Sequence, residues 1–284
     1  MLSSDNKVKV SLWSKGSQFA EKRKGTMKKL ISTGLIFLTV LLFTAPNAFA
    51  WGPQAHQAIG WIADQHLTPE IKKTLTNRYN IRRLERVAKW ADTVRKKKKQ
   101  GPWHYVNIAE GKLFYEKNRD CKTGECVVEK IITFTQVLKN NTASNEEKTT
   151  AIKYLAHLVG DAHQPLHAGN RNDRGGNSIP IQFRGDKTNL HALWDSGLLQ
   201  GGYGKMPGYA ERLNLGITPQ SIEEWGNLSA EIWINESRLF AIDHVYKLTT
   251  PMSKEYIRRS REIVDLRIRQ AGVRLALLLN QALK

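Results

Sequence analysis

Apolar residues return every three or four positions along most of the chain after residue 50, and this spacing constrains the fold most. A period near 3.6 residues places apolar side chains on one face of an α-helix. The pattern predicts helices over 53–67, 83–95, 146–162, 220–247 and 253–283. The last is the clearest, because one stripe contains Ile257, Val264, Ile268, Ala271, Leu275 and Leu278. Stripes of this kind pack in protein cores, so we expect a mainly α-helical fold.

Two segments interrupt the helical pattern. Residues 168–189 are rich in Gly, Asn and Asp around the apolar stretch 179–183, which predicts a loop with a short hairpin. The tripeptide 184–186 is interpreted as a turn. Residues 201–219 are rich in Gly and Pro and predict a long loop. We therefore expect a single helical domain with a small β-hairpin and long loops.

The N-terminal segment has the composition of a secretory signal peptide. Met27 is followed by two lysines, an apolar run over 30–43 and the small-residue site Ala48-Phe49-Ala50. The apolar run is too short to span a bilayer comfortably. We expect translation to start at Met27, residues 1–26 to be an artefactual or non-native extension, and residues 27–50 to be a signal peptide. The mature protein would then be secreted or periplasmic.

Residues 51–284 have a length that suits one domain with a full core. They keep 36 of the 44 basic and 24 of the 26 acidic residues, which gives a net charge of +12. A basic secreted protein is expected to bind polyanions such as nucleic acid or membrane head groups. No stretch of this mature part favours stable membrane association, and we expect a monomer.

Cys121 and Cys126 are the two cysteines of the chain. In an exported protein, such a pair typically forms a disulfide that closes a small loop. No further soft ligands lie near them in the sequence, so we do not expect a metal site built on sulfur.

Histidine and aspartate recur in a pattern that favours a metal centre. His157 and Asp161 are four residues apart, as are His191 and Asp195, so each pair shares one helix face. The candidates around them are His56, Asp92, His104 and His167. One such pair alone is usually structural, but several together favour imidazole and carboxylate ligands for catalytic zinc. Zinc ions that share a carboxylate can hold a phosphoryl group between them.

Six motifs, taken in order, resemble those of the three-zinc, single-strand-specific nuclease and 3′-nucleotidase family of fungi, plants and bacteria. The motifs are Trp51-Gly52, Trp90-Ala-Asp92, His104-Tyr-Val-Asn107, His157-x-x-x-Asp161-x-His-Gln-Pro-Leu-His167, Gly175-Gly-Asn177 and His191-x-x-x-Asp195. The resemblance covers residues 51–284. It implies a zinc-dependent nuclease domain with the fold that this family shares with bacterial zinc-dependent phospholipase C.

The resemblance also implies the ligands of three Zn²⁺ ions. The first ion would be bound by Asp92, His104, His157 and one oxygen of Asp161. The second would be bound by His167, His191 and Asp195. The third would be bound by the other oxygen of Asp161, by His56, and by the free α-amino nitrogen and carbonyl oxygen of Trp51. Cleavage after Ala50 would therefore create a ligand.

The same resemblance assigns the catalytic and substrate-binding roles. Asp161 would bridge two ions and Asp92 would orient the attacking water, while Arg95 would hold the phosphate. Tyr105 would stack on a base that Asn107 recognises, and Asn177 would lie against the nucleotide. Stacking needs an unpaired base, so the expected substrates are single-stranded DNA, RNA and 3′-nucleotides. The products would carry 5′-phosphates.

Two other functions are compatible with parts of the pattern. A phospholipase C could use the same metal centre, although Asp195 stands where the phospholipases carry glutamate. A non-catalytic polyanion- or zinc-binding protein would explain the charge. It would not need the shared carboxylate of Asp161 or the nearby Arg95.

Overall fold

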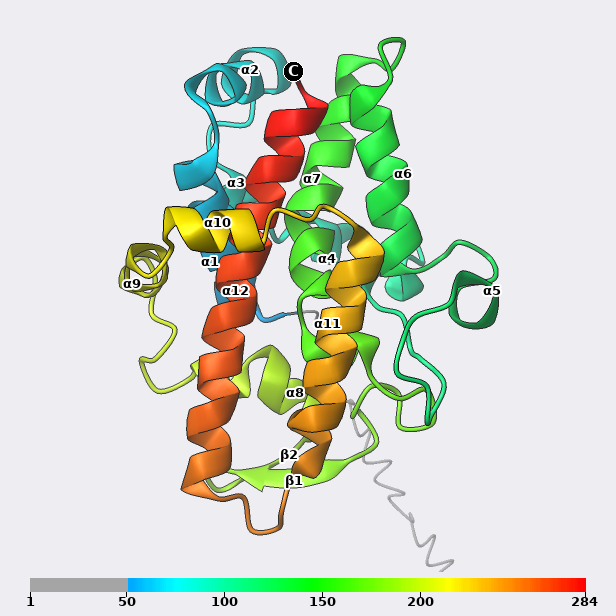
Figure 1. Cartoon of the computed structure of the whole chain (residues 1–284), viewed down its shortest axis with the longest axis vertical. Helices are drawn as coiled ribbons and strands as arrows, with labels where there is room; N and C mark the ends of the chain where they lie inside the picture. The colour runs from blue at the N-terminus through cyan, green and yellow to red at the C-terminus, as the bar shows by residue number, and fades with distance from the viewer. Residues whose placement is uncertain (1–50) are drawn as a thin grey trace, which may run out of the picture. The chain divides into compact units, whose positions relative to one another are not determined.

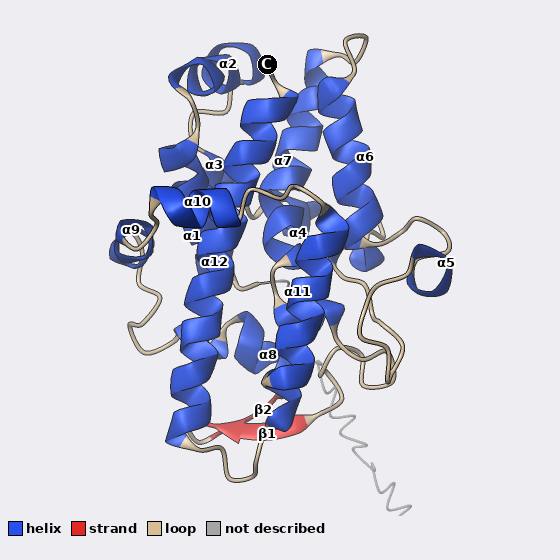
Figure 2. Ribbon diagram, viewed as in Figure 1, coloured by secondary structure: helices blue, strands red, loops and turns tan. Residues whose placement is uncertain are grey.

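The computed structural model describes residues 51–284, so the expected extension and signal peptide lie outside the described residues. The elements in chain order are α1 (Pro53–His66), α2 (Pro69–Tyr79), α3 (Leu84–Val87), α4 (Trp90–Arg95), η1 (Gly101–His104), α5 (Lys117–Asp120), α6 (Val127–Lys139), α7 (Asn145–Ala162), η2 (Pro165–Ala168), β1 (Pro180–Phe183), β2 (Asp186–Asn189), α8 (Leu190–Asp195), η3 (Gly197–Leu199), α9 (Gly208–Leu215), α10 (Pro219–Glu224), α11 (Ala230–Asp243), η4 (Val245–Lys247) and α12 (Lys254–Ala282). The expected mainly α-helical fold is confirmed. Figure 2 shows a two-stranded sheet among the helices.

Helix α12 is the longest helix of the described part and packs against α1 and α7. It begins after Ser253, whose side chain accepts a hydrogen bond from the amide of Tyr256. Its buried stripe includes Val264, Ile268 and Leu275, as the apolar spacing predicts. Figure 1 shows α12, α7 and α6 side by side, with the hairpin near the first turn of α12. Between residues 51 and 284, no helix combines the length and the apolar character needed to cross a bilayer.

Close approach of α1 and α12 depends on a residue without a side chain. A Cβ placed on Gly272 of α12 would lie 2.5 Å from Cγ2 of Ile62 on α1. Both helices contact α7, and the tight crossing brings the start of α1, with His56, against the interior. The packing of these three helices therefore determines where the first candidate ligand lies.

Helix α7 carries the first His–Asp pair and is well defined at both ends. Ser144 and Glu147 form a capping box at its N-terminus. The helix ends at Ala162, and Pro165 then starts the short helix η2. His157 and Asp161 lie one turn apart near the buried end, so both side chains reach the same place in the core.

The hairpin is antiparallel, with Phe183 paired to Asp186 across the turn. Both turn residues have positive φ, 56° at Arg184 and 93° at Gly185, as a two-residue type I′ turn requires. The expected turn and hairpin are confirmed. Because β2 leads directly into α8, the hairpin fixes the start of the helix that carries His191 and Asp195.

Four details of the helix prediction were wrong or incomplete. The segment 201–219 is not one long loop, because α9 forms where Tyr209, Ala210 and Leu213 are buried. The segment 220–247 is interrupted between α10 and α11, and the segment 83–95 divides into α3 and α4. Helices α2 and α6 were not predicted.

Ion pairs connect helices α11 and α12, and the apolar pattern of the sequence does not reveal them. Arg267 and Arg274 of α12 are buried, and each has a guanidinium nitrogen 2.6 Å from an oxygen of Glu236 on α11. Burial would raise the pKa of Glu236, but the two guanidinium groups outweigh this effect and lower it. The carboxylate therefore stays ionised and compensates two buried cations that would be costly alone.

Candidate metal centre

The first group of candidate ligands comes from three elements, one of which, α7, is distant in the sequence from the other two. Asp92 comes from α4, His104 ends η1, and His157 and Asp161 come from α7. Oδ2 of Asp161 lies 2.9 Å from Nδ1 of His104 and 3.1 Å from Nε2 of His157. These two ring nitrogens are 3.0 Å apart. Oδ1 of Asp92 lies 3.8 Å from Nδ1 of His104 and 3.6 Å from Nε2 of His157.

These separations fit one zinc ion. A tetrahedral ion with bonds of about 2.0–2.2 Å holds its ligand atoms about 3.3–3.6 Å apart. The measured distances, 2.9–3.8 Å, lie on both sides of that range. Nδ1 of His157 faces a backbone acceptor, the carbonyl of Ala88, at 2.7 Å. This contact orients the ring so that Nε2 points at the other ligands.

The second group lies where η2 meets α8. Nε2 of His191 is 3.2 Å from Oδ2 of Asp195, and Nε2 of His167 is 3.6 Å from Oδ1 of the same carboxylate. Nδ1 of His191 lies 2.6 Å from the carbonyl of Gly175, which leaves Nε2 as the metal-facing nitrogen. The three residues form a buried group of potential ligands.

Asp161 lies between the two groups and faces a third. Its Oδ1 is 3.4 Å from Nε2 of His56 and 3.6 Å from Nδ1 of His167. Its side chain is completely buried, as is that of His56. One carboxylate therefore presents one oxygen to the first group and the other to the surrounding histidines, as a bridging ligand would.

Trp51 is completely buried at the start of the described residues. The next amide, that of Gly52, donates a 2.6 Å hydrogen bond to the carbonyl of Asp195. A Cβ on Gly52 would lie 2.4 Å from Oγ of Ser196, so the close contact requires glycine. The start of the described residues is thus held against the helix that carries two candidate ligands, and the role of Trp51 as a ligand stays a prediction.

Several buried polar atoms of the centre have no hydrogen-bond partner among the described residues. They are both ring nitrogens of His56, Oδ1 of Asp92, Nε2 of His104, Oδ1 of Asp161 and Nδ1 of His167. A buried polar atom left unsatisfied costs about 1–3 kcal/mol. A cluster of such atoms in one place therefore indicates a missing partner. Imidazole and carboxylate donors without thiolate fit zinc in a catalytic site.

The electrostatics of the centre favour ionised carboxylates. Burial would raise the pKa of Asp161, but His157 and His104 outweigh it and hold the pKa well below the usual range. The pKa of Asp195 is lowered to about 2, because His191 and His167 outweigh the effect of burial. Burial lowers the pKa of His56, whereas for His157 and His191 the effect of burial is outweighed by Asp161 and Asp195, which raise the pKa in the absence of a metal ion. Ionised carboxylates and a neutral imidazole are the forms that bind a cation.

Three of the expected substrate residues lie on segments that also carry candidate ligands. Nη1 of Arg95 lies 3.9 Å from Oδ1 of Asp92, one turn along α4. Tyr105 and Asn107 are partly exposed and directly follow His104. Gly175, with φ of 64°, lets its loop approach η2, because a Cβ there would lie 2.5 Å from the carbonyl oxygen of Leu166. Asn177 donates to the carbonyl of Arg174 and is partly exposed.

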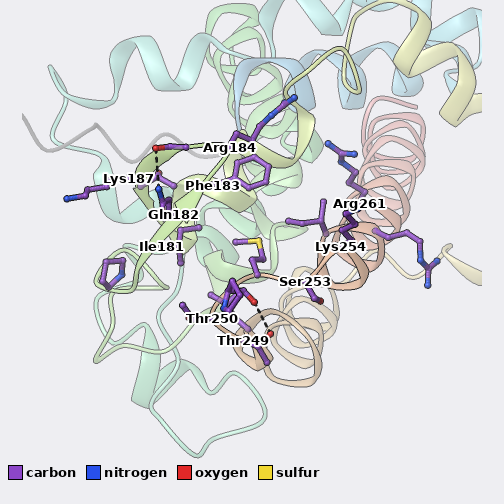
Figure 3. Close-up of a pocket in the computed structure, with 18 of the residues that line it drawn as sticks. Ile181, Gln182, Phe183, Arg184, Lys187, Thr249, Thr250, Ser253, Lys254 and Arg261 are labelled. Carbon is purple, nitrogen blue, oxygen red and sulfur yellow. Dashed lines mark hydrogen bonds between the residues drawn. The ribbon is translucent and has the colours of Figure 1, made fainter.

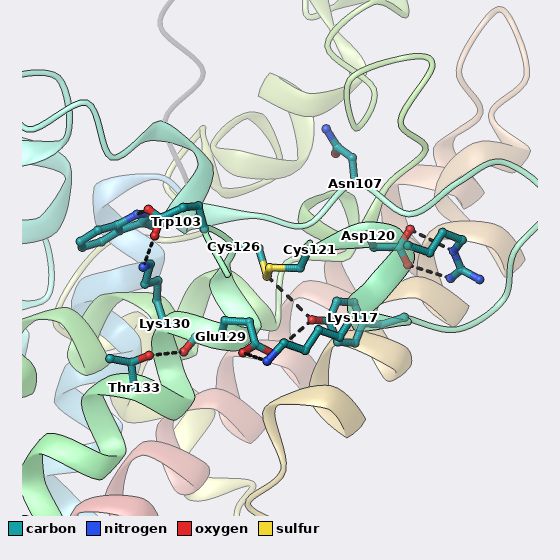
Figure 4. The surroundings of a disulfide bond; sticks show 12 residues. Trp103, Asn107, Lys117, Asp120, Cys121, Cys126, Glu129, Lys130 and Thr133 are labelled. Atoms are coloured by element: carbon teal, nitrogen blue, oxygen red, sulfur yellow. Dashed lines mark hydrogen bonds and ion pairs between the residues drawn. A yellow bond between two sulfur atoms is a disulfide. The ribbon is translucent and has the colours of Figure 1, made fainter. Parts of the chain in front are cut away.

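The disulfide between Cys121 and Cys126 is confirmed, and it supports the segment that carries His104 and Tyr105 (Figure 4). The amide of Val127 donates to the carbonyl of Tyr105 at 3.3 Å. The indole Nε1 of Trp103 donates to Oε2 of Glu125 inside the disulfide loop. The loop therefore restrains the backbone on which a candidate ligand and a candidate base-stacking residue lie.

Two supporting contacts were not predicted from the sequence. Nε2 of Gln164 donates a 2.6 Å hydrogen bond to Oδ1 of Asp195. The loop before Asn177 is held by Asp173, whose Oδ1 accepts from the Tyr246 hydroxyl and the Gly176 amide. Gln164 lies inside the His157–His167 motif, so its position was a usable signal. Tyr246 is distant in the sequence from Asp173, and no sequence signal indicated their contact.

A pocket of 1190 Å³ lies away from the predicted site residues, between the hairpin and the first turns of α12 (Figure 3). Its lining includes Phe183, Arg184, Lys254 and Arg261. None of the predicted metal, catalytic or substrate residues lines this pocket, so its size does not bear on the metal centre.

Comparison with known proteins identifies the family. The family model described as S1/P1 Nuclease matches residues 51–284, the whole described part of the chain. The chain belongs to the S1/P1 nuclease family. Membership makes the protein a phosphodiesterase of the endonuclease type, and it argues against both the phospholipase C and the non-catalytic alternatives.

Individual members of the S1/P1 nuclease family agree with this assignment. Endonuclease 2 of Arabidopsis thaliana is 31% identical over 278 residues, covering 87% of this chain and 96% of the relative. Nuclease S1 of Aspergillus oryzae is 27% identical over 267 residues, covering 83% and 92%. Nuclease P1 of Penicillium citrinum is 29% identical over 158 residues, covering 51% and 57%.

Proposed function

We propose that the protein is a secreted, zinc-dependent endonuclease that hydrolyses single-stranded DNA and RNA to products with 5′-phosphates. It also removes the phosphate of 3′-nucleotides and acts as a monomer. The mature enzyme starts at Trp51, after removal of residues 27–50, and contains three zinc ions. The observation that carries the proposal is the convergence of buried imidazole and carboxylate groups on Asp161 in a chain of the S1/P1 nuclease family.

The proposed ligands divide among three ions. Asp92, His104, His157 and Oδ2 of Asp161 hold the first, which the 2.9–3.8 Å separations of these atoms support. His167, His191 and Asp195 hold the second. Oδ1 of Asp161, His56 and the amino and carbonyl groups of Trp51 hold the third. When bound, zinc ions lower the pKa of water and stabilise the attacking and leaving oxygens of a phosphoryl transfer.

The protein groups around the ions orient the reactants. Asp92 presents a buried carboxylate oxygen without a hydrogen-bond partner among the described residues, and we assign it to orient the attacking water. Water attacks phosphorus in line with the 3′ oxygen and loses a proton, the P–O3′ bond breaks, the 3′ oxygen takes up a proton and leaves as a hydroxyl, and the phosphate stays on the 5′ side. Arg95, beside Asp92, binds the phosphate through its planar guanidinium.

Tyr105 and Asn107 select single-stranded substrate. Both follow His104 and are partly exposed, so a base can reach them while its phosphate lies at the metal centre. Tyr105 stacks on the base, and stacking needs a base that has left its duplex neighbours. The amide of Asn107 both donates and accepts, so it recognises the base edge. Asn177 approaches the nucleotide from the loop that follows Gly175.

Metal removal tests the proposed function directly. A chelator is expected to abolish hydrolysis of single-stranded DNA by protein that starts at Trp51, and added zinc to restore it. Elemental analysis should give three zinc ions per chain, and end-labelling should locate the phosphate on the 5′ end. A duplex of the same sequence and a choline phospholipid serve as controls. Activity that survives the chelator, or faster hydrolysis of the phospholipid than of DNA, contradicts the proposal.

Substitution of Tyr105 tests the basis of single-strand preference. Tyr105→Ala is expected to lower kcat/KM for oligonucleotides. The loss should correspond to roughly 1–3 kcal/mol of binding free energy, the usual value of one base stack. Hydrolysis of bis(p-nitrophenyl) phosphate, which has no base, should change much less. Tyr105→Phe keeps the ring and is the matched control, with near-normal activity on both substrates. Equal losses of the alanine variant on both substrates would show that Tyr105 is structural.

A further inference from the structure

Positive charge is concentrated beside the proposed active site. Residues 82–99 contain nine Lys or Arg and two acidic residues, so they supply +7 of the net +12 of residues 51–284. The ion pairs of this segment join Arg83 to Glu85 and Arg95 to Asp92. All four side chains of Lys96–Lys99 are exposed, and no ion pair among the described residues includes them. Their charge is therefore available to an external anion.

The lysine run has a defined backbone. It continues directly from α4, with the amide of Lys98 donating to the carbonyl of Val94 at 2.9 Å. The amide of Gln100 then donates to the carbonyl of Arg95 at 2.9 Å. The Gln100 side chain accepts from the buried Tyr154 hydroxyl at 2.8 Å, which ties the end of the run to α7. The structure thus presents these like charges at a fixed place.

Two indole rings lie among the lysines. Nζ of Lys98 and Nζ of Lys153 lie 5.6 Å and 5.3 Å from the ring centre of Trp90. Nζ of Lys130 lies 4.5 Å from the ring centre of Trp103 and is ion-paired with Glu125. Both indoles are partly exposed. Each ring therefore combines a stacking surface with an adjacent cation.

The two indoles belong to one aromatic cluster next to the metal centre. The ring centres of Trp90 and Trp103 lie 5.1 Å and 5.4 Å from that of Tyr154. Trp90 shares α4 with Asp92, and Trp103 directly precedes His104. We define the lysine–tryptophan face as the surface made by Trp90, Lys96–Lys99, Trp103 and Lys153. It is continuous with the helix that carries Arg95.

We propose that the lysine–tryptophan face binds the single-stranded substrate outside the active site. The lysines contact successive phosphates, and the indoles stack with unpaired bases, as in other surfaces that bind single strands without sequence preference. A membrane is a poorer fit, because none of the exposed large hydrophobic residues of the described part, Leu113, Phe114, Leu215, Ile232 and Leu239, belongs to the face. The inference rests on the proposed nuclease function and adds a second region of contact with the strand.

The test compares two charge-matched variants. One replaces Lys96, Lys97 and Lys98 by glutamine, and the control replaces Lys72, Lys73 and Lys254, which are exposed lysines of α2 and α12. Each removes three positive charges. The kcat/KM for a long oligothymidylate and for a thymidine dinucleotide is measured over a range of salt concentrations. For the long strand, the log–log salt slope of the first variant should become shallower by about 2, or ~0.7 per lost phosphate contact.

The loss should be an increase in KM at constant kcat, and the control variant should keep the steep wild-type slope. The dinucleotide has a single phosphate, which the proposed active site would occupy, so all three proteins should cut it equally. An unchanged salt slope in the first variant, or an equal change in the control variant, overturns the proposed role of the lysine–tryptophan face. So does a selective loss of binding to phosphatidylglycerol vesicles with normal oligonucleotide kinetics. Failure of the wild-type protein to cut even the dinucleotide would instead reject the nuclease function itself.

Discussion

Replacement of Asp161 by asparagine is expected to abolish nuclease activity and to lower the zinc content. The side chain is completely buried, with Oδ2 facing His104 and His157 and Oδ1 facing His56 and His167. An amide keeps one oxygen but replaces the other by an NH₂ group, which cannot bind a cation. It also removes the negative charge that we place between two dications. We expect a loss on the order of a thousandfold or more, which corresponds to at least about 4 kcal/mol of transition-state stabilisation.

Asp64→Asn is the matched control for the Asp161 variant. Asp64 lies on α1, and its carboxylate accepts hydrogen bonds from the amide of Leu84 at 2.9 Å and 3.1 Å. Burial raises the pKa of Asp64 to about 6, so loss of its charge should cost less there than at Asp161. The control should retain activity and zinc. Near-normal turnover of the Asp161 variant with a full complement of zinc would rule out the bridging role.

Extension of the chain in front of Trp51 is expected to give a folded protein that binds less zinc and cuts poorly. Trp51 is completely buried, and the adjacent Gly52 amide is bound to Asp195. An α-amino group has a pKa near 8, so a nearby dication readily displaces its proton. An extension converts this amine into an amide, which is a poor ligand at neutral pH. Protein that keeps residues 27–50, or that carries an N-terminal tag, should therefore have low activity.

Proteolytic removal of the extension should restore activity and zinc without refolding. A protein with one additional glycine before Trp51 is the sharper control. It has a free amino group and almost no added bulk, yet the amine lies one residue away from its proposed place. Low activity in this protein would assign the effect to the Trp51 amine rather than to crowding. Three zinc ions and full activity in the extended form would remove the N-terminus from the metal centre.

The pairing of His157 with Asp161 and of His191 with Asp195 was easier to predict than the helix boundaries, for a physical reason. The spacing of His157 to Asp161 and of His191 to Asp195 requires both members of each pair to share a helix face, and the structure has them so. Segment 201–219 was misjudged because its glycines and proline indicate a loop. The buried Tyr209 and Leu213 nevertheless give α9 a core-facing side.

Other features could not be predicted because they depend on tertiary packing. The carbonyl of Gly175 that orients His191 is a backbone atom, and its position follows from a loop held by Tyr246 and Asp173. Local spacing carries no information about such contacts. The meeting of Trp90, Trp103 and Tyr154 likewise joins α4, η1 and α7, which only the folded chain brings together.

The burial of Trp51 makes the two ends of residues 51–284 unequal for protein engineering. Lys284 is exposed after the last turn of α12, where Figure 1 marks the C-terminus. Affinity handles, fluorophores or attachment to a solid support therefore belong at Lys284, where added chain meets solvent. A handle at Trp51 would have to leave from a completely buried position. Immobilised preparations coupled through the C-terminus should thus retain the geometry around Trp51.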